Sequence, residues 1–276
     1  MIGTSSRRIV VGSLRAKLAL SKSGLSDYVV NPYLGCQHAC RYCYVQRYFR
    51  SKLRPPLQWG SEIYIRTNIG ELACRETRTK TRGRVLLSSM TDAYQPVESH
   101  SHLTREILQC LVEGGFPVSV LTKSSLVLRD LDLLRKRDDS EVTFSISSMD
   151  REVYRAFEPY ATPPEARMDA LREVLEAGVK GGVFLAPHIP SAEPFEAQYK
   201  QVFERATELR LERLTFDFLN YGSVMKRAIS SAYEQYYPQG RAAFSRLLAD
   251  PKSYERAWRD AVHGMADAYN IKVDFV

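Results

Sequence analysis

The segment NPYLGCQHACRYCY, residues 31–44, contains three of the five cysteines of the chain. Cys36, Cys40 and Cys43 have the spacing CxxxCxxC. Thiolate sulfur is a soft ligand that selects iron–sulfur clusters, zinc or Cu(I), so three clustered cysteines indicate a metal site. A protein that only stores a [4Fe–4S] cluster supplies four thiolates. Three would leave one coordination position open, which is how catalytic metal sites hold another molecule.

Two other interpretations of the cysteines stay open at this point. One is a structural zinc site, with His38 or a distant residue as the fourth ligand, in a module that binds nucleic acid. Structural zinc sites favour paired CxxC units, and the chain has no second pair, which disfavours this interpretation. The other is an iron–sulfur scaffold or sensor without turnover.

The composition is that of a globular protein. Its 276 residues are 44% hydrophobic and 26% charged, enough for a sizeable core. No apolar run approaches the length of a membrane span, and the basic N-terminus is interrupted by Gly12, Arg15 and Lys17, so it is a poor signal peptide. We therefore expect a cytoplasmic protein without a membrane partner, whose cysteines stay reduced and form no disulfide framework.

The charge is concentrated in the part of the chain that carries the cysteines. Residues 1–84 hold 16 Lys and Arg against 4 Asp and Glu, a net charge of +12, and the remainder holds 23 against 28, a net charge of −5. Basic and aromatic residues alternate in 41–54, and a second basic run lies at 75–84. Such a surface can hold phosphates and stack bases, which predicts a nucleic-acid or other polyanionic substrate. A solvated basic face is the alternative.

Strands and helices alternate along most of the chain. We expect strands at 27–31, 63–65, 85–88, 117–121, 142–146, 183–186, 214–218 and 272–276. We expect helices at 70–79, 101–113, 128–137, 151–157, 164–177, 195–211 and 250–269. Repeated strand-then-helix units indicate a parallel sheet, but this pattern does not distinguish an open sheet from a barrel. Residues 1–25 look irregular and basic.

Several segments together resemble a known family. The cysteine segment, with Tyr42 directly before the last cysteine, resembles the radical S-adenosylmethionine (SAM) superfamily. The chain is similar to its spore photoproduct lyase-related branch in the segments SSMTDAYQPVE (88–98), LTKSSLVLRD (121–130), FSISSMD (144–150) and FEPYATPPEAR (157–167). The resemblance implies an α/β fold, a partial (β/α)6 barrel of the radical SAM type. We expect a basic N-terminal strap (1–25), a radical SAM core (26–220) and a C-terminal helical extension packed on the core (221–276).

The resemblance also implies the chemistry. Cys36, Cys40 and Cys43 would bind a [4Fe–4S] cluster, and SAM would chelate its open iron. An electron from a reductant such as a flavodoxin or ferredoxin would cleave SAM to methionine and a 5′-deoxyadenosyl radical, which abstracts hydrogen from a substrate that the sequence does not identify. The protein contributes position, dryness and electrostatics. His38 and Gln37 are expected to point outward.

Seven further residues are expected to bind SAM. In the family, the strand before Ser89 is often followed by a Gly-Gly-Glu-like segment that meets the methionyl amino group. The expected contacts are Tyr42 near the adenine, Ser89, Thr91 and Asp92 as polar substitutes for that segment, Lys123 facing the SAM carboxylate, and Ser145 and Ser147, which share a strand face, at the ribose or carboxylate. Packing, capping or surface roles remain alternatives for each. Glu158 and Arg167 are expected to form a structural ion pair instead.

One departure from the branch limits the expected reaction. In spore photoproduct lyase a cysteine that donates hydrogen lies close before the Thr/Ser/Asp segment, whereas this chain has Ser88-Ser89-Met90 there. Cys74 and Cys110 lie in expected helices, and Cys110 is expected to be an inert buried thiol. Repair of thymine dimers by the same donor is therefore not expected, and no catalytic residue is assigned.

Overall fold

The computed structural model describes residues 7–52 and 57–276, and its contacts divide the chain into two units. The first unit comprises the chain up to Ala39 together with Val45–Glu141, and the second comprises Cys40–Tyr44 together with Val142–Val276. Five residues of the cysteine segment therefore belong to the second unit although they lie between two parts of the first.

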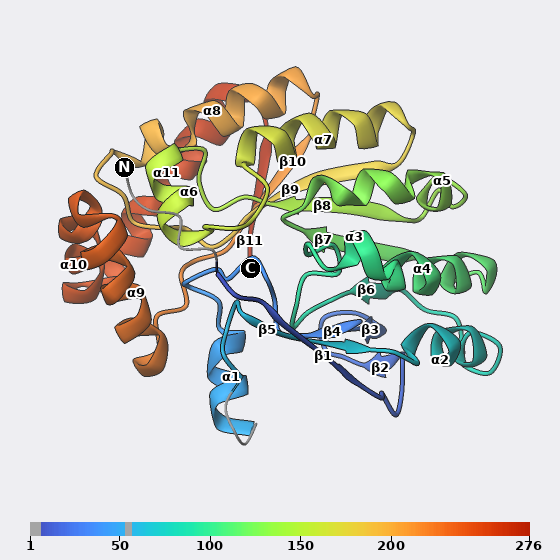
Figure 1. Cartoon of the computed structure of the whole chain (residues 1–276). Coiled ribbons are helices and arrows are strands. Elements are labelled where there is room, and N and C mark those ends of the chain that lie inside the picture. Colours follow the sequence, from blue (N-terminus) through green and yellow to red (C-terminus); the bar gives the residue numbers. More distant parts are fainter. Residues whose placement is uncertain (1–6, 53–56) are drawn as a thin grey trace. The chain divides into compact units, whose positions relative to one another are not determined.

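The first unit contains two sheets (Figure 1). One has the strand order β2-β3-β6-β7, in which β3, β6 and β7 are parallel and β2 is antiparallel to β3. The other has the order β1-β5-β4, with β1 parallel and β4 antiparallel to β5. The strands are β1 (Val10–Leu14), β2 (Ser21–Lys22), β3 (Tyr28–Val30), β4 (Tyr33–Leu34), β5 (Glu62–Arg66), β6 (Val85–Leu87) and β7 (Val118–Thr122).

The helices of the first unit follow the strands as expected for α/β units. They are α1 (Val45–Lys52), α2 (Ile69–Glu76), α3 (Glu98–Ser101), α4 (Leu103–Glu113), the 3-10 helix η1 (Ser125–Asp130) and α5 (Leu131–Leu134). Helix α4 buries Leu103, Ile107, Leu108 and Leu111 on one side. The helix ends at Glu113, as predicted. Gly115 follows with a φ of +78°, a left-handed conformation that residues with a side chain rarely adopt.

The basic N-terminal segment is more regular than expected. Residues Val10–Leu14 form strand β1, which pairs in parallel with β5, and Gly12 lies opposite Tyr64. A Cβ at Gly12 would lie 2.6 Å from the Tyr64 ring, so the glycine leaves room for that ring. Further along, Asn68 Oδ1 accepts a hydrogen bond from Ala16 N at 2.7 Å, and the Glu76 carboxylate accepts two, from Ala19 N and Leu20 N, both at 3.0 Å.

Helices α2 and α4 lie side by side and are joined by a disulfide between Cys74 and Cys110 (Figure 1). The expectation that these two cysteines stay reduced, with Cys110 as an inert thiol, was therefore wrong. Their Cα atoms are 4.8 Å apart, within the range that a disulfide spans. Helical periodicity placed Cys110 on a buried face but carried no information on which helix packs against that face.

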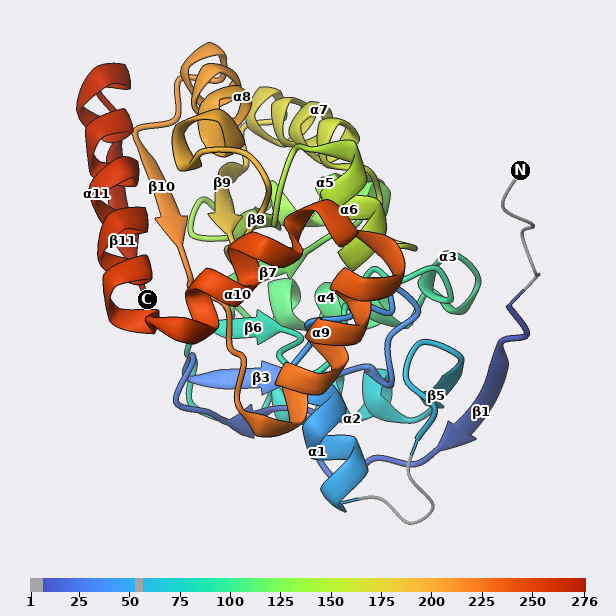
Figure 2. The same cartoon turned by 90° about the vertical axis from the view of Figure 1, so that its left-hand side faces the viewer.

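The second unit contains a parallel sheet of strand order β8-β9-β10-β11. Its strands are β8 (Glu141–Ser145), β9 (Lys180–Leu185), β10 (Arg213–Phe216) and β11 (Lys272–Phe275). Its helices are α6 (Arg151–Phe157), α7 (Pro164–Glu176), α8 (Phe195–Glu208), α9 (Ser223–Tyr236), the 3-10 helix η2 (Pro238–Gly240), α10 (Arg241–Ala249) and α11 (Pro251–Tyr269). Helices α8 and α11 pack against each other (Figures 1 and 2).

Aromatic packing holds the α8–α11 side of this sheet. Phe216 of β10 contacts Tyr199 and Phe203 of α8 and Trp258 of α11, with ring centroids 5.4–6.3 Å apart. The His188 ring is stacked on Trp258 at 5.2 Å and is buried, and burial lowers its pKa to about 3, so the imidazole is neutral at pH 7. This side of the sheet is therefore a closed apolar core.

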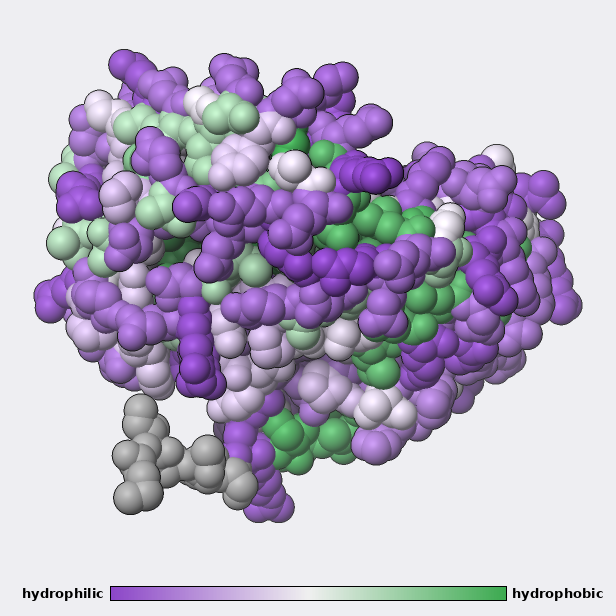
Figure 3. Space-filling view, turned by 90° about the horizontal axis from the view of Figure 1, so that it is seen from above, coloured by the Kyte–Doolittle hydropathy of each residue, from purple (hydrophilic) through white to green (hydrophobic). Residues whose placement is uncertain are grey.

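Most expected elements are confirmed to within a few residues at each end. The expected helix 128–137 is instead the 3-10 helix η1 followed by the short α5, because Ser124 accepts a hydrogen bond from Leu126 N and starts the turn earlier. Among the described residues, no helix is long and apolar enough to cross a membrane. Figure 3 shows one face of the molecule, on which hydrophilic side chains (purple) predominate over hydrophobic ones (green).

Reduction of the Cys74–Cys110 disulfide should destabilise the protein. The bond closes a loop with a sequence separation of 36, for which the chain-entropy model gives about 4 kcal/mol of unfolding free energy. We expect a reductant to lower the denaturant midpoint of cluster-free wild type and to leave that of a Cys74→Ser/Cys110→Ser variant unchanged. Alkylation of unfolded, unreduced wild type at all five cysteines, rather than three, would contradict the disulfide.

Candidate active site

The cysteine loop, residues 36–43, follows β4 and is not helical. It starts at Gly35, whose φ is +87°, and a Cβ there would collide with the backbone oxygen of Glu62. Only glycine fits this position without strain. Cys36 and Cys40 are buried and Cys43 is partly buried. The loop thus holds its thiols in a largely dry environment, which suits a cluster.

Gln95 fixes the first half of the loop. Its side chain is fully buried, and its Oε1 accepts a hydrogen bond from Gln37 N at 2.8 Å. Its Nε2 donates to Gly35 O at 3.2 Å and to Thr91 Oγ1 at 2.9 Å. The Gln37 side chain in turn accepts from Val97 N at 2.5 Å. The expectation that Gln37 points outward was therefore wrong, because its amide oxygen pairs with a backbone donor inside the unit.

Asp92 fixes the same region through its carboxylate. Oδ1 accepts hydrogen bonds from Tyr94 N and Thr122 Oγ1, and Oδ2 from Lys123 N, all at 2.8 Å. His38 Nε2 lies 3.2 Å from Oδ2, and His38 is buried, which contradicts the expected outward orientation. Burial raises the pKa of Asp92, but His38 and these hydrogen bonds outweigh it and bring the pKa to about 2. The carboxylate is thus ionised at pH 7.

Residues expected to bind SAM follow β6 and β7 in this unit. Asn31 Oδ1 accepts hydrogen bonds from Ser89 N at 3.0 Å and Met90 N at 2.9 Å, which fixes the segment after β6. Thr91 Oγ1 donates to Gly35 O at 2.5 Å. Ser89 and Lys123 are partly exposed, whereas Asp92 is buried. The structure thus brings Thr91 and Asp92 to the base of the cysteine loop.

A chain of buried polar groups fixes the second half of the loop. The Tyr42 hydroxyl donates a hydrogen bond to Glu158 Oε1, and Glu158 Oε2 lies 2.5 Å from Arg167 Nη2. Arg167 also donates to Ser145 O at 2.7 Å and to Thr162 O at 2.6 Å. Glu158 and Arg167 are both buried, so the expected structural ion pair is confirmed. Burial, together with the Glu158 charge, raises the pKa of Tyr42, which stays protonated.

Sequence reasoning missed what this ion pair does. Tyr42 lies between Cys40 and Cys43 in the chain, and Cys40 and Tyr42 pack in an apolar cluster with Phe157, Ile229 and Tyr233. The pair therefore anchors the residue between two of the thiols to strand β8 through Ser145. The signal was present in the segment FEPYATPPEAR, in which an acidic and a basic residue nine positions apart flank a turn rich in proline.

The basic residues do not form one continuous face. Arg41 donates a hydrogen bond to Ala156 O at the end of α6 and lies over the Tyr236 ring at 3.6 Å, so it has a structural role. The run 75–84 precedes β6, whereas residue 31 follows β3, and β3 and β6 are parallel. The second basic run therefore lies at the end of the strands opposite to Asn31.

Ser145, at the end of β8, and Ser147, two residues later, differ in their bonding. Ser145 Oγ donates to Ala186 O at 3.1 Å. Ser147 Oγ is buried and has no hydrogen-bond partner within the described residues. Ser145 is the last residue of β8 and Ser147 lies in a bend two residues later, so their sharing a face stays a prediction.

The donor chemistry of the loop fits an iron–sulfur cluster, since three thiolates are the ligands that such clusters use. Neither in the loop nor elsewhere do the described residues contain a group of three or more His, Cys, Asp or Glu placed to hold a single metal ion. In a cubane cluster each cysteine binds a different iron, so its ligands do not converge on one atom.

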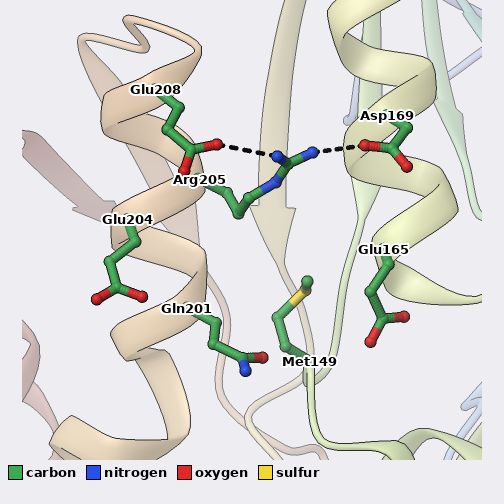
Figure 4. Close-up of a pocket in the computed structure, with 7 residues that line it drawn as sticks. All are labelled: Met149, Glu165, Asp169, Gln201, Glu204, Arg205 and Glu208. Carbon is green, nitrogen blue, oxygen red and sulfur yellow. Dashed lines mark hydrogen bonds and ion pairs between the residues drawn. The ribbon is translucent and has the colours of Figure 1, made fainter.

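A pocket of about 340 Å³ lies between α7 and α8 (Figure 4). Arg205 of α8 spans it and pairs with Asp169 of α7 at 2.6 Å and with Glu208 at 2.9 Å. Its remaining lining residues are Met149, Glu165, Gln201 and Glu204. No residue expected to bind SAM or the cluster lines this pocket, and its carboxylates are exposed to solvent.

Comparisons with known proteins find similarity to the radical SAM superfamily and to spore photoproduct lyase. The family model described as Radical SAM superfamily matches residues 30–197. An uncharacterized protein of Methanocaldococcus jannaschii is 32% identical over 88% of this chain and 89% of its own. Spore photoproduct lyase of Bacillus subtilis is 24% identical over 97% of this chain and 81% of its own. A solved structure of spore photoproduct lyase complexed with dinucleoside spore photoproduct matches with a TM-score of 0.71 and 20% identity, over 97% of this chain and 81% of that chain. The likeness confirms the expected fold class, the α/β partial barrel.

The Tyr42–Glu158–Arg167 contacts generate a stability prediction. Glu158→Gln leaves the Arg167 guanidinium buried without its counter-charge, which should lower the unfolding free energy by about 3–5 kcal/mol. Tyr42→Phe removes one hydrogen bond to the carboxylate and should cost about 1–3 kcal/mol. Chemical denaturation measures both, with Glu165→Gln on the exposed side of α7 as a control that should change little. A Glu158→Gln variant as stable as the control would contradict the role of the pair.

Proposed function

The chain belongs to the radical SAM superfamily, and we propose that it cleaves SAM reductively at a [4Fe–4S] cluster held by Cys36, Cys40 and Cys43. The observation that carries this proposal is the cysteine loop itself, whose two halves are each fixed by buried hydrogen bonds. The bound cluster would supply the electron that converts SAM into methionine and a radical that abstracts hydrogen from the substrate. The electron would come from a reductant such as a flavodoxin or ferredoxin in the cytoplasm.

The residues around the loop divide into two roles in this proposal. Thr91, Asp92, Ser145 and Tyr42 use their side chains within the protein and position the backbone around SAM. The ammonium of Lys123 would bind the SAM carboxylate, and the hydroxyls of Ser89 and Ser147 would bind polar atoms of SAM. Asp92 supports Lys123 by accepting a hydrogen bond from its backbone N–H, which fixes where the lysine side chain starts.

A nucleic acid is the substrate class that the surface of the first unit supports. Helix α1 exposes Arg47 and Tyr48 next to each other, a cation for phosphate and a ring for a base. A relative in the comparisons, spore photoproduct lyase, was solved with a dinucleoside. Arg54 and the side chain of Arg50, which belong to the same basic run, lie outside the described residues. The run 75–84 precedes β6, at the strand ends opposite to Asn31, and we expect it to lie outside this surface.

Cluster loading tests the assignment of the cysteines. Each of the variants Cys36→Ala, Cys40→Ala and Cys43→Ala removes one of three protein ligands, so anaerobic reconstitution should leave it without a stable cluster. Iron content, visible absorption and SAM-dependent formation of 5′-deoxyadenosine should be lost together, while the control Asp260→Asn, an exposed change on α11, keeps all three. Full iron content in one of the loop variants would remove that cysteine from the ligand set, and a colourless wild type that binds zinc would overturn the proposal.

Binding of a single-stranded oligonucleotide tests the substrate class. Binding should weaken with salt, because each neutralised phosphate releases counterions. Arg47→Glu should weaken binding and lower the slope of log K against log salt by about 1. Arg78→Glu is the matched control, since it makes the same charge change in the basic run before β6 and should have little effect. No binding by wild type at about 50 mM salt, where phosphate contacts are strong, or equal losses in the two variants, would contradict the proposal.

A further inference from the structure

The cysteine loop receives one contact from the basic segment at the start of the chain. Arg7 lies shortly before strand β1, and its Nη2 donates a hydrogen bond to Gln37 O at 2.9 Å. The arginine is partly buried. A basic strap was expected at residues 1–25, but nothing in the sequence of that segment assigned a partner to Arg7.

Strand pairing holds Arg7 beside the loop. Val10 N donates to Ser61 O at 2.8 Å, and β1 then pairs in parallel with β5 (Figure 2). Strand β4, which leads into the cysteine loop, runs antiparallel to β5 on its other side. The start of β1 and the end of β4 therefore both lie near the start of β5. The position of Arg7 is thus set by a sheet.

The turn before β5 makes room for this contact. Gly60 has a φ of +89°, and a Cβ there would lie 2.6 Å from Ala39 Cβ and 2.9 Å from Arg7 Nη1. The guanidinium and Ala39 therefore lie against the same glycine. Ala39 itself has a φ of +53°, a left-handed conformation that residues with a side chain rarely adopt. Such a residue persists only where its surroundings fix it, and Arg7 is part of these surroundings.

Gln37 is fixed on both sides of its backbone. Its N–H donates to Gln95 Oε1 at 2.8 Å, and its carbonyl accepts from Arg7. Because Gln37 directly follows Cys36 in the chain, fixing its carbonyl limits how the backbone between Cys36 and Cys40 can move. Arg7 and Gln95 thus hold the first half of the loop from two separate elements.

The guanidinium also brings a positive charge to the loop. Arginine stays protonated in proteins. Reduction adds a negative charge to a cluster that is held by thiolates, and charge near a cluster is one of the factors that set its potential. A cation in a partly buried position is screened less than an exposed one, so it favours the reduced form and raises the potential.

We propose that Arg7 is a positioning residue of the cysteine loop, which holds the backbone after Cys36 in place and whose charge stabilises the reduced cluster. The role of the charge rests on the proposed function, which places a cluster on the loop. The hydrogen bond to Gln37 O is a property of the metal-free chain and can be tested without the cluster.

Amide hydrogen exchange of the metal-free protein tests the positioning role. Arg7→Ala should speed exchange of the Gln37 and Ala39 amides about tenfold or more, because a hydrogen bond from a charged group is lost. The Cys43 amide, which donates to Cys40 O in the other half of the loop, should keep its wild-type rate. Arg8→Ala is the matched control, since it removes the same charge from an exposed neighbour.

Three results of this experiment would overturn the inference. One is wild-type exchange at Gln37 and Ala39 in Arg7→Ala, and another is the same acceleration in Arg8→Ala. The third is an equal acceleration at Cys43, because it would indicate a general loss of stability.

The anaerobically loaded protein tests the role of the charge. Arg7→Ala should release iron to a chelator about tenfold faster than wild type, and the midpoint potential of its cluster should be lower. Arg7→Lys keeps the charge without the planar guanidinium, so it should restore the potential more fully than the exchange rates. Arg8→Ala should match wild type in both measurements.

Two outcomes separate this inference from the proposed function. A wild-type potential in Arg7→Ala overturns the role of the charge and leaves the cluster assignment intact. A wild type that takes up no cluster overturns the proposed function and the role of the charge with it, and the exchange rates of the metal-free protein then decide the positioning role alone.

Discussion

The buried ion pair between Glu158 and Arg167 is the contact on which the arrangement of the second unit depends. Burial of two charges is costly and is offset only when each remaining donor and acceptor is satisfied. That condition is met here, since Arg167 also donates to Ser145 O and Thr162 O, and Glu158 accepts from Tyr42. The pair thereby fixes the residue between Cys40 and Cys43 to strand β8 through Ser145. Gln95 and Asp92 do the equivalent for Gln37 and His38 in the first unit.

The candidate functional groups share one position relative to the strands. Ser89, Lys123 and Ser147 each come within two residues after the end of β6, β7 or β8. This placement is the usual one for ligand sites in parallel α/β folds, because strand ends can vary in chemistry while the apolar strand interiors keep the fold. The basic run 75–84 lies before β6 and so belongs to the opposite ends of the strands, where it can balance charge but not contact such a site.

Local sequence patterns were enough to predict most strands and helices and to single out the cysteine loop. Alternating apolar runs located the strands after residue 26 except β4, and the spacing of Cys36, Cys40 and Cys43 predicted a cluster loop. Contacts between distant residues were not accessible in this way. Tyr42 and Glu158 are 116 positions apart, and nothing in either neighbourhood specifies the other. The same holds for the Cys74–Cys110 disulfide, for the buried orientation of Gln37 and His38, and for β1, whose partner strand β5 lies some fifty residues later.

The central claim is that buried protein contacts, rather than the metal, hold the cysteine loop in place. Amide hydrogen exchange of the metal-free protein tests it most directly. The amides of Gln37, Ala39, Arg41 and Cys43 donate to Gln95 Oε1, Cys36 O, Phe157 O and Cys40 O, respectively. The account predicts that these amides exchange far more slowly than in an unfolded chain before any iron is added. Exchange at the rate of an unfolded chain until the cluster is loaded would contradict it.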